Sequence, residues 1–554
     1  MSVAVAVVLP LLTALLATGS GPAGRLGRRL APFASAALLV PLATGERVDW
    51  SWALLGLGLG VDPWGGPFVL LTAIAWSLAA WFALDTVRGD TRRFWLGWSL
   101  SLWGMTMVLL AQTLVVFYLG YVAVSLAAYL MIVHAGTGPA WRAGRIYLLL
   151  AFAGEAAIVS GVLILAGYYG NVELSLLATP DFAAGLEPAR WLLLVGFAVK
   201  LGIMPLHVWL PLAHPIAPVP AGAILSGVIV KAGLLGWLKL APPQGIDALA
   251  GAPALVALGL LTAFGGVLLG LTQNKLKTVL AYSTISQMGL VLVGFAALSM
   301  QPGDERWLAA LGLLALHHGL TKSSLFLACG CAPGASRARA LLLALPALSL
   351  AAAPLTTGFL AKVWLKRAVS AGIELGQLPA FSYTLVSLTS LATAVLMWRL
   401  WVLAMRERDT ATALHPAWAL LTLAALGVPW LWASSAGMLV APGASNVWAA
   451  TWPLLLAVAL VLAGRALGRP GVRLPEGDVV VLFERLGGRV SAPELSPAPP
   501  AGRTRTARPA HRVQLRSAIG RRLEDVEGSL REMPMVGLLM LLVGVVVWLV
   551  LWLG

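Results

Sequence analysis

Seven ionisable residues lie within long apolar stretches of this sequence, where a charged side chain is costly. They are Lys200, Lys231, Lys322, Lys362, Glu155, His317 and His318. A lysine at the centre of a lipid-facing helix costs roughly 2.5–3.5 kcal/mol, so four isolated lysines would together cost roughly 10 kcal/mol or more. Burial favours the neutral amine, which lets a lysine release and regain a proton near neutral pH. Such groups, with water between them, form a candidate proton relay.

Each of these residues also has a structural interpretation. Lys200 and Lys362 could satisfy backbone carbonyls freed at nearby helix breaks, and Lys322 could extend to the membrane interface. One of the two histidines could be a hydrogen-bonded core residue. Four lysines along one chain favour the relay, and His318 and Lys322, four residues apart, would share a helix face.

The sequence contains no motif for covalent chemistry. There is no glycine-rich phosphate loop after a strand, no CxxC pair and no HExxH motif, so we expect no cofactor, no metal and no self-contained active site. Cys329 and Cys331 are interpreted as small packing residues. The net charge of +15 does not indicate nucleic-acid binding, because the basic residues lie mostly in loops between apolar stretches.

Prolines interrupt two apolar stretches close to the lysines. Pro205 follows Lys200 in FAVKLGIMPLHVWLPLAHP, and Pro354 precedes Lys362 in APLTTGFLAKVWLK. Proline removes a backbone donor, and a bilayer tolerates the resulting break only within protein or beside water. An odd number of spans separates the two breaks, so the second has inverted topology. The pattern predicts two inverted five-helix repeats, each with a broken helix, as in transporters.

Composition sets the fold class. Of the 554 residues, 59% are hydrophobic and 11% are charged, and apolar runs of about one bilayer thickness recur along the chain. We therefore expect an all-α, polytopic membrane protein with about 16 transmembrane helices. The first run, 2–18, is read as a retained span because the arginines follow it rather than precede it. The predicted spans are 2–18, 31–44, 65–85, 93–111, 112–133, 144–168, 189–210, 218–239, 252–272, 278–300, 306–329, 341–370, 380–404, 416–440, 447–464 and 534–553.

Loop charges predict the orientation. The odd-numbered connections carry most of the loop arginines and lysines, whereas the even-numbered ones carry few, among them Lys239, Lys366 and Arg367. Because basic loops stay in the cytoplasm, we expect a multi-pass protein of the cell inner (cytoplasmic) membrane with both termini outside.

These spans suggest six segments. We expect N-terminal transmembrane helices, a first antiporter-like repeat, a second repeat, C-terminal transmembrane helices, a cytoplasmic linker and a last transmembrane helix, over 1–92, 93–239, 252–404, 405–464, 465–533 and 534–554. Within the linker, 511–532 has apolar residues at helical spacing. An amphipathic helix on the membrane or on a partner subunit fits this pattern, and so does a plain cytoplasmic helix.

Four motifs resemble one protein family. They are FAVKLGIMPLHVWLPLAHPIAPVPAGAILSGVIVKAG, QNKLKTVLAYSTISQMG, HHGLTKSSLFLACG and PLTTGFLAKVWLKRAV. They are similar to the antiporter-like subunits shared by respiratory complex I, Mrp-type cation/proton antiporters and membrane-bound hydrogenases, over about residues 55–405. The resemblance implies proton-transfer roles for Lys200, Lys231, His318, Lys322 and Lys362.

The sequence departs from this family at two carboxylates. Tyr121 and Val122 stand where the resemblance implies a Trp-Glu pair, and Leu212 stands where it implies an aspartate. The missing glutamate would be the partner of Lys200. Our hypothesis is that Glu155 takes over this role; the alternative is a degenerate first half-channel.

The resemblance implies a proton- or cation-translocating subunit that works with other membrane subunits in a lipid bilayer. Its ions would be protons or Na⁺, and any electron transfer would occur in partner subunits. One alternative is the ion-driven subunit of an Mrp-like antiporter or an inorganic-carbon uptake complex. Another is a non-conducting membrane scaffold.

Overall fold

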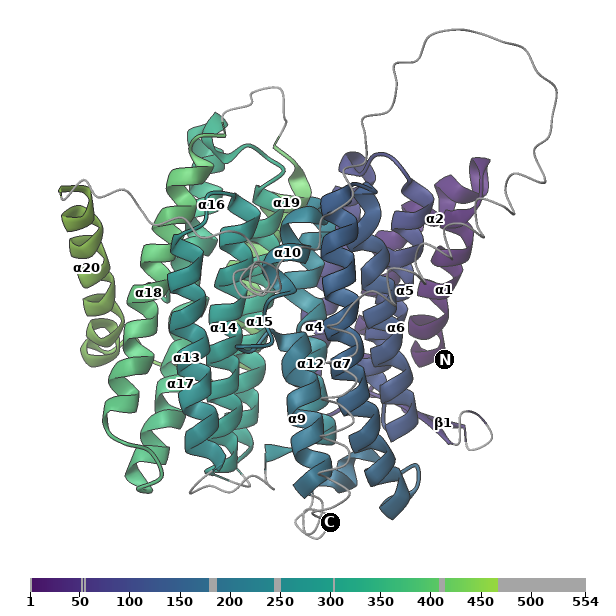
Figure 1. Cartoon of the computed structure of the whole chain (residues 1–554), viewed down its shortest axis with the longest axis horizontal. Coiled ribbons are helices and arrows are strands. Elements are labelled where there is room, and N and C mark those ends of the chain that lie inside the picture. Colours follow the sequence, from purple (N-terminus) through teal and green to yellow (C-terminus); the bar gives the residue numbers. More distant parts are fainter. Residues whose placement is uncertain are drawn as a thin grey trace, which may run out of the picture. The chain divides into compact units, whose positions relative to one another are not determined.

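The computed structural model describes residues 2–50, 53, 56–178, 187–243, 251–301, 304–407 and 414–466. Most of them are helical (Figure 1). The helices before residue 250 are α1 (Ser2–Thr18), α2 (Gly21–Ala36), α3 (Leu39–Thr44), α4 (Gly66–Thr86), α5 (Thr91–Leu110), α6 (Leu114–Ile132), α7 (Gly138–Tyr169), α9 (Glu187–Leu201), α10 (Leu210–Ile216), α11 (Val219–Ile224) and α12 (Lys231–Leu240). After it follow α13 (Gly251–Leu271), α14 (Leu276–Ser299), α15 (Glu305–Ala328), α16 (Arg337–Leu350), α17 (Thr357–Glu374), α18 (Phe381–Ala404), α19 (Pro416–Ser435) and α20 (Ala444–Ala466).

The helices match the predicted spans. Each predicted span up to residue 464 coincides with a helix or an interrupted helix, which confirms the all-α membrane fold. Among the described residues, 10 helices are long and apolar enough to cross a membrane. The predicted span 534–553, the helix 511–532 and all but the first two residues of 465–533 lie outside the described residues. The count of about 16 spans therefore stays a prediction.

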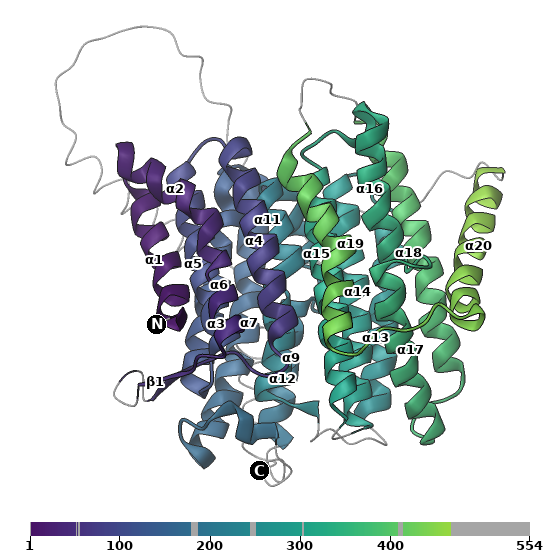
Figure 2. The same cartoon turned by 180° about the vertical axis from the view of Figure 1, so that it is seen from behind.

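Two helices are interrupted at the expected prolines. α9 ends at Leu201 and α10 begins at Leu210, with Pro205 between them. In the same way, Pro354 lies between α16 and α17. In Figure 1, α9 lies below α10, whereas α16 lies above α17, and the view from behind in Figure 2 again places α16 above α17. The two broken helices thus cross the bundle in opposite directions, as inverted repeats require.

A two-stranded ribbon is an element that the sequence analysis did not predict. β1 (Val48–Trp50) pairs antiparallel with β2 (Leu57–Leu59). The ribbon is tied to the segment after α7, because Arg47 Nη1 lies 2.8 Å from Glu173 Oε1. The Arg47 guanidinium holds the pKa of the Glu173 carboxyl below its usual value, so this pair stays ionised at neutral pH.

Two lysines counted with the loop charges lie inside the bundle instead. Lys239 in α12 and Lys366 in α17 are only 3% and 6% exposed. Lys239 Nζ is 2.8 Å from Asp62 Oδ2 and donates to the carbonyls of Leu109 and Ala111, which are at the C-terminal end of α5 and need donors. The loop-charge count placed this lysine in a connection, at the end of the predicted span 218–239, because it takes no account of a compensating partner.

Lys239→Met is therefore expected to destabilise the fold. It leaves the Asp62 carboxylate partly buried without its cation and two helix-end carbonyls without a donor, at a cost of about 3 kcal/mol. The midpoint of thermal unfolding of the full chain in detergent measures this loss. The double variant Asp62→Asn with Lys239→Met should lose less than the two single variants combined. An unchanged midpoint in Lys239→Met would contradict the assignment.

Candidate functional site

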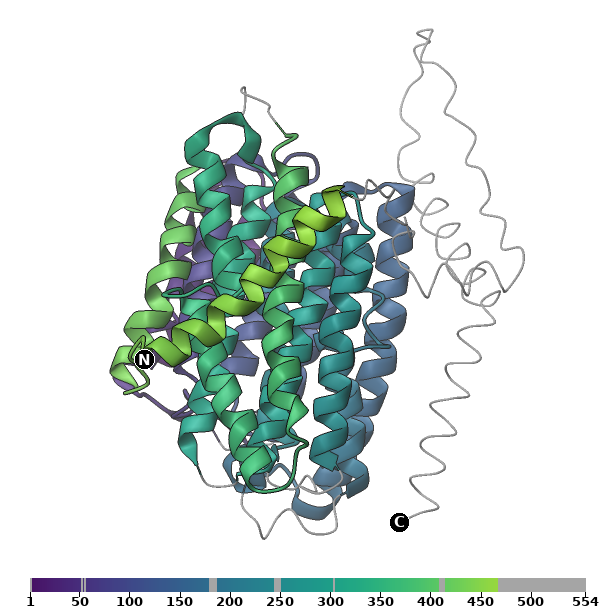
Figure 3. The same cartoon turned by 90° about the vertical axis from the view of Figure 1, so that its left-hand side faces the viewer.

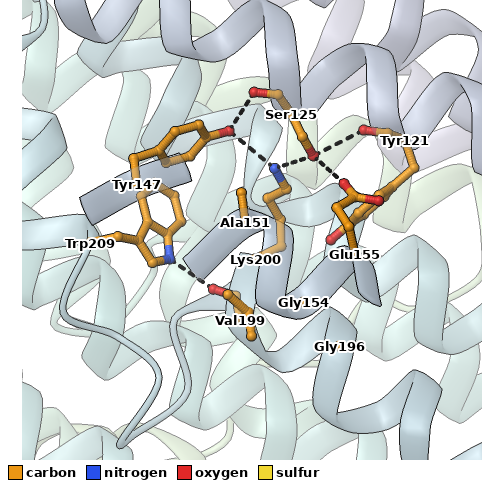
Figure 4. A pocket seen from close by; sticks show the side chains of 10 residues that line it. All are labelled: Tyr121, Ser125, Tyr147, Ala151, Gly154, Glu155, Gly196, Val199, Lys200 and Trp209. Carbon is orange, nitrogen blue, oxygen red and sulfur yellow. Dashed lines mark hydrogen bonds between the residues drawn. The ribbon is translucent and has the colours of Figure 1, made fainter. Parts of the chain in front are cut away.

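Lys200 is held by hydroxyl groups near the end of α9. Its side chain is buried, and Nζ donates to Ser125 Oγ at 2.8 Å and to Tyr147 OH at 3.3 Å (Figure 4). Nζ also lies 5.3 Å from the ring centroid of Tyr121, within the range of a cation–π contact. Tyr121 thus contacts the lysine from the position where the family resemblance implies tryptophan.

Glu155 on α7 joins the same cluster through Ser125. Its Oε1 accepts a hydrogen bond from Ser125 Oγ at 2.8 Å, so this hydroxyl lies between the carboxyl group and Lys200 (Figure 4). The other carboxyl oxygen, Oε2, is buried and has no hydrogen-bond partner among the described residues. A cavity of about 10 Å³ lies among these side chains, which is room for about one water. The arrangement suits proton exchange between the two ionisable groups.

Small residues and the helix break fix this geometry. A Cβ on Gly196 would lie 2.8 Å from the carbonyl oxygen of Gly154, so glycine lets α7 and α9 approach closely. Trp209 Nε1 donates to the Val199 carbonyl at 2.8 Å, next to the break. In the described structure, Trp209 and not Lys200 therefore donates a hydrogen bond to this carbonyl. The lysine amine instead donates to Ser125.

Lys231 forms a second cluster with His318. Nζ lies 2.7 Å from His318 Nδ1 and 3.1 Å from the Ser226 carbonyl, and both ionisable side chains are fully buried. A π-helical turn, η3 (Leu225–Ile229), connects α11 to α12 just before this lysine. Such turns are frequent at functional sites.

Two glycines permit this contact. A Cβ on Gly227 would lie 2.0 Å from Ser323 Oγ and 2.8 Å from the Gly319 carbonyl oxygen. A Cβ on Gly319 would in turn lie 2.7 Å from the Gly227 carbonyl oxygen. η3 therefore packs directly on α15, which places Lys231 against His318.

The second broken helix carries the next polar groups. His317 Nδ1 lies 2.9 Å from Oγ1 of Thr357, the first residue of α17 after the break that contains Pro354. Further along α17, Lys362 is 8% exposed, and its Nζ donates to Thr389 Oγ1 on α18. Lys362 thus binds a hydroxyl group rather than a freed carbonyl.

Lys322 has a different partner from the one that helix spacing suggested. It is fully buried, which excludes extension to the interface, and its Nζ donates to the Leu280 carbonyl on α14 at 2.9 Å. His318 and Lys322 lie on one helix, but the direct partner of His318 is Lys231. The structure therefore gathers the predicted residues into several local clusters on adjacent helices.

The sequence analysis missed the neutral members of these clusters. Ser125, Tyr147, Thr357 and Thr389 each bind one of the predicted ionisable residues. Nothing in their spacing marks them, because hydroxyl residues also hydrogen-bond to their own helix in apolar segments. Among the described residues, no group of three or more His, Cys, Asp or Glu side chains could hold a metal ion.

These features define a helical membrane protein whose interrupted helices lie beside buried lysines, and sequence comparison identifies its family. Residues 111–389 match the family model described as NADH:quinone oxidoreductase/Mrp antiporter, transmembrane. The match covers half of the chain, and the chain belongs to this family.

Curated relatives agree with this assignment. Hydrogenase-4 component B of Escherichia coli is 36% identical over 37% of this chain and 32% of its own length. NAD(P)H-quinone oxidoreductase chain 4 2 of Thermosynechococcus vestitus is 34% identical over 51% of this chain and 53% of its own. The matches thus span between a third and about half of the length of these relatives.

Two solved structures share the fold. The Mrp complex from Dietzia sp. aligns with a TM-score of 0.66 and 22% identity, covering 88% of this chain and 59% of that chain. The archaeal membrane-bound sulfane sulfur reductase aligns with a TM-score of 0.66 and 20% identity, covering 83% of this chain and 99% of that one.

Proposed function

We propose that this chain is a proton-translocating subunit of a multi-subunit membrane complex. The observation that carries the proposal is the direct contact between two fully buried basic groups, Lys231 Nζ and His318 Nδ1, at 2.7 Å. Two adjacent cations are unfavourable in a low dielectric, so one proton shared by the pair is the stable state. A pair that holds one proton in either of two places is a unit of a relay.

Proton transfer within this pair conserves both the number of protons and the total charge. The Lys231 ammonium donates its proton to His318 Nδ1, which leaves a neutral amine and an imidazolium. The proton on His318 Nε2 then has to pass to a water molecule beside it, because this atom is buried and has no hydrogen-bond partner among the described residues. Because His317, the residue before His318 on α15, binds Thr357 on α17, the second broken helix is the natural continuation.

The first repeat would supply protons through Ser125. This hydroxyl accepts a hydrogen bond from Lys200 and donates one to Glu155, so a proton can pass from the ammonium through the hydroxyl to the carboxylate. The transfer converts an ion pair into two neutral groups, which suits a buried site. Glu155 thereby acts as the carboxylate partner of Lys200, in place of the absent glutamate.

The proposal extends to the setting of the chain. We place it in the cytoplasmic membrane with both termini outside, with repeats over 93–239 and 252–404 and with other membrane subunits as partners. The partners would drive transport, by electron transfer or by a second ion. Support comes from the relatives, whose names describe them as components or chains of a hydrogenase and of quinone oxidoreductases.

Transport by the purified native complex in proteoliposomes, followed with pH and sodium probes, tests this proposal. Wild type should move protons, and Lys200→Ala should slow them about tenfold, because water beside Ser125 replaces the lysine amine only in part. The variant complex must remain assembled by gel filtration. Unchanged transport in Lys200→Ala would mean that the first repeat is structural, and sodium movement without proton movement would identify the other ion.

A further inference from the structure

A second cavity, of about 140 Å³, lies between α17, α18 and α20. Three basic residues, Lys362, Lys366 and Arg367, contribute to its wall. The remaining described lining residues are uncharged, among them Tyr383, Asn446 and Ala449. The cavity is large enough for several waters or for a small anionic group.

Among the described residues that line this cavity, no carboxylate compensates the positive charge. Lys362 and Lys366 are buried and bind neutral oxygens, Thr389 Oγ1 and the Ala449 carbonyl. α18 and α20 contain no acidic residue, and the carboxylate of α17, Glu374, is seven residues beyond Arg367 and is not part of the described lining. Since buried cations without a counterion are costly, an anion in the cavity would stabilise them.

A hydrogen bond from Lys366 of α17 holds α20 against the cavity. Pro453 has no N–H group, so the Ala449 carbonyl, four residues earlier in α20, lacks its helical donor. Lys366 Nζ donates to this carbonyl at 3.0 Å. α20 runs obliquely across α18 (Figure 3). Its other side is apolar and exposed, with Trp448 62% and Val458 57% accessible, so the cavity lies next to the lipid-facing surface of the bundle.

The depth of Lys366 matches that of lipid headgroups. It is nine residues after Thr357, the first residue of α17, which corresponds to about 14 Å along the helix. Broken transporter helices are interrupted near the bilayer midplane, and half of the hydrocarbon thickness is about 15 Å. Tyr383 and Trp364, whose rings contact Lys366 and Arg367, are residues typical of this interface.

We propose that this cavity binds the phosphate group of an anionic phospholipid, with the acyl chains along the exposed apolar faces of α18 and α20. Lys366 and Arg367 contact the phosphate, and Tyr383 and Asn446 border it. The lipid thereby compensates the cations and fastens α20 to α17. Binding of the lipid does not depend on ion transport, so failure of the relay proposal would leave this one intact.

Native mass spectrometry of the full chain in its native complex, stripped of lipid and titrated, tests the proposal. The probes are phosphatidylglycerol, phosphatidylcholine with the same acyl chains, and sodium phosphate. Phosphatidylglycerol should bind more tightly than phosphatidylcholine, and Lys366→Gln with Arg367→Gln should weaken it roughly 10- to 30-fold. Arg29→Gln, at an exposed arginine of α2 outside this cavity, serves as the matched control and should change nothing.

The single variant Arg367→Gln tests the site without disturbing the packing, because the Arg367 side chain is exposed. It should lower the affinity for phosphatidylglycerol several-fold while gel filtration and unfolding remain as in wild type. Equal phosphatidylglycerol binding by the double variant and wild type would overturn the proposal. Inorganic phosphate that competes as strongly as the lipid would also overturn it, since the site would then take a free anion.

Discussion

His318→Gln is expected to reduce proton transport about 100-fold while the complex remains assembled. Glutamine Oε1 can still accept a hydrogen bond from Lys231, so the buried amine keeps a partner. The amide cannot take up and release a proton, and general acid–base groups typically contribute factors of about 10² to 10⁴. Initial rates of proton movement in proteoliposomes measure the effect, with unfolding of the variant as a stability check.

His134→Gln provides the matched control. This histidine lies at a helix end and binds the Arg88 carbonyl, away from the buried clusters. Its replacement should leave transport unchanged within about a factor of two. If His318→Gln transported at the wild-type rate, Lys231 and His318 would be a structural pair and not a relay unit.

Glu155→Gln is the second substitution with a large expected effect. The amide keeps the size of the side chain and can accept the hydrogen bond from Ser125, but it cannot be protonated. Protons from Lys200 then have no acceptor through this hydroxyl, so transport should fall about 30- to 100-fold. Glu155→Asp, which retains a carboxyl group one methylene shorter, should recover part of the activity. A fully active Glu155→Gln variant would show that another group serves Lys200.

A double-variant cycle separates coupling from independent effects. If Ser125 connects the two groups, Ser125→Ala should cost nearly as much transport as Glu155→Gln, and combining them should add little. Multiplicative losses would instead mean that Glu155 and Ser125 act separately. The unfolding midpoints of all three variants show whether a variant transports less because it is less stable.

The helix breaks show how far local sequence chemistry predicts this fold. Pro205 and Pro354 removed backbone donors within apolar stretches, and both helices are interrupted there. The ribbon β1–β2 was not predicted, because its short strands carry no distinctive pattern. Lys239 was counted with the loop charges at the end of its span, although its contact with Asp62 permits burial. Hydropathy scales give the free energy of moving a single residue from water into an apolar medium. They do not include a counterion that is distant in the sequence.

The sequence by itself determined the membrane class, the positions of the two breaks and the seven ionisable residues first singled out in apolar helices, because these depend on composition and on the backbone chemistry of proline. Only the tertiary structure decided the partners: Ser125 lies between Lys200 and Glu155, and Lys231 rather than Lys322 contacts His318. Hydrogen bonds require contact to within about 3 Å. That contact depends on how closely helices approach, which the facing glycines of α15 and η3 set only once the chain has folded.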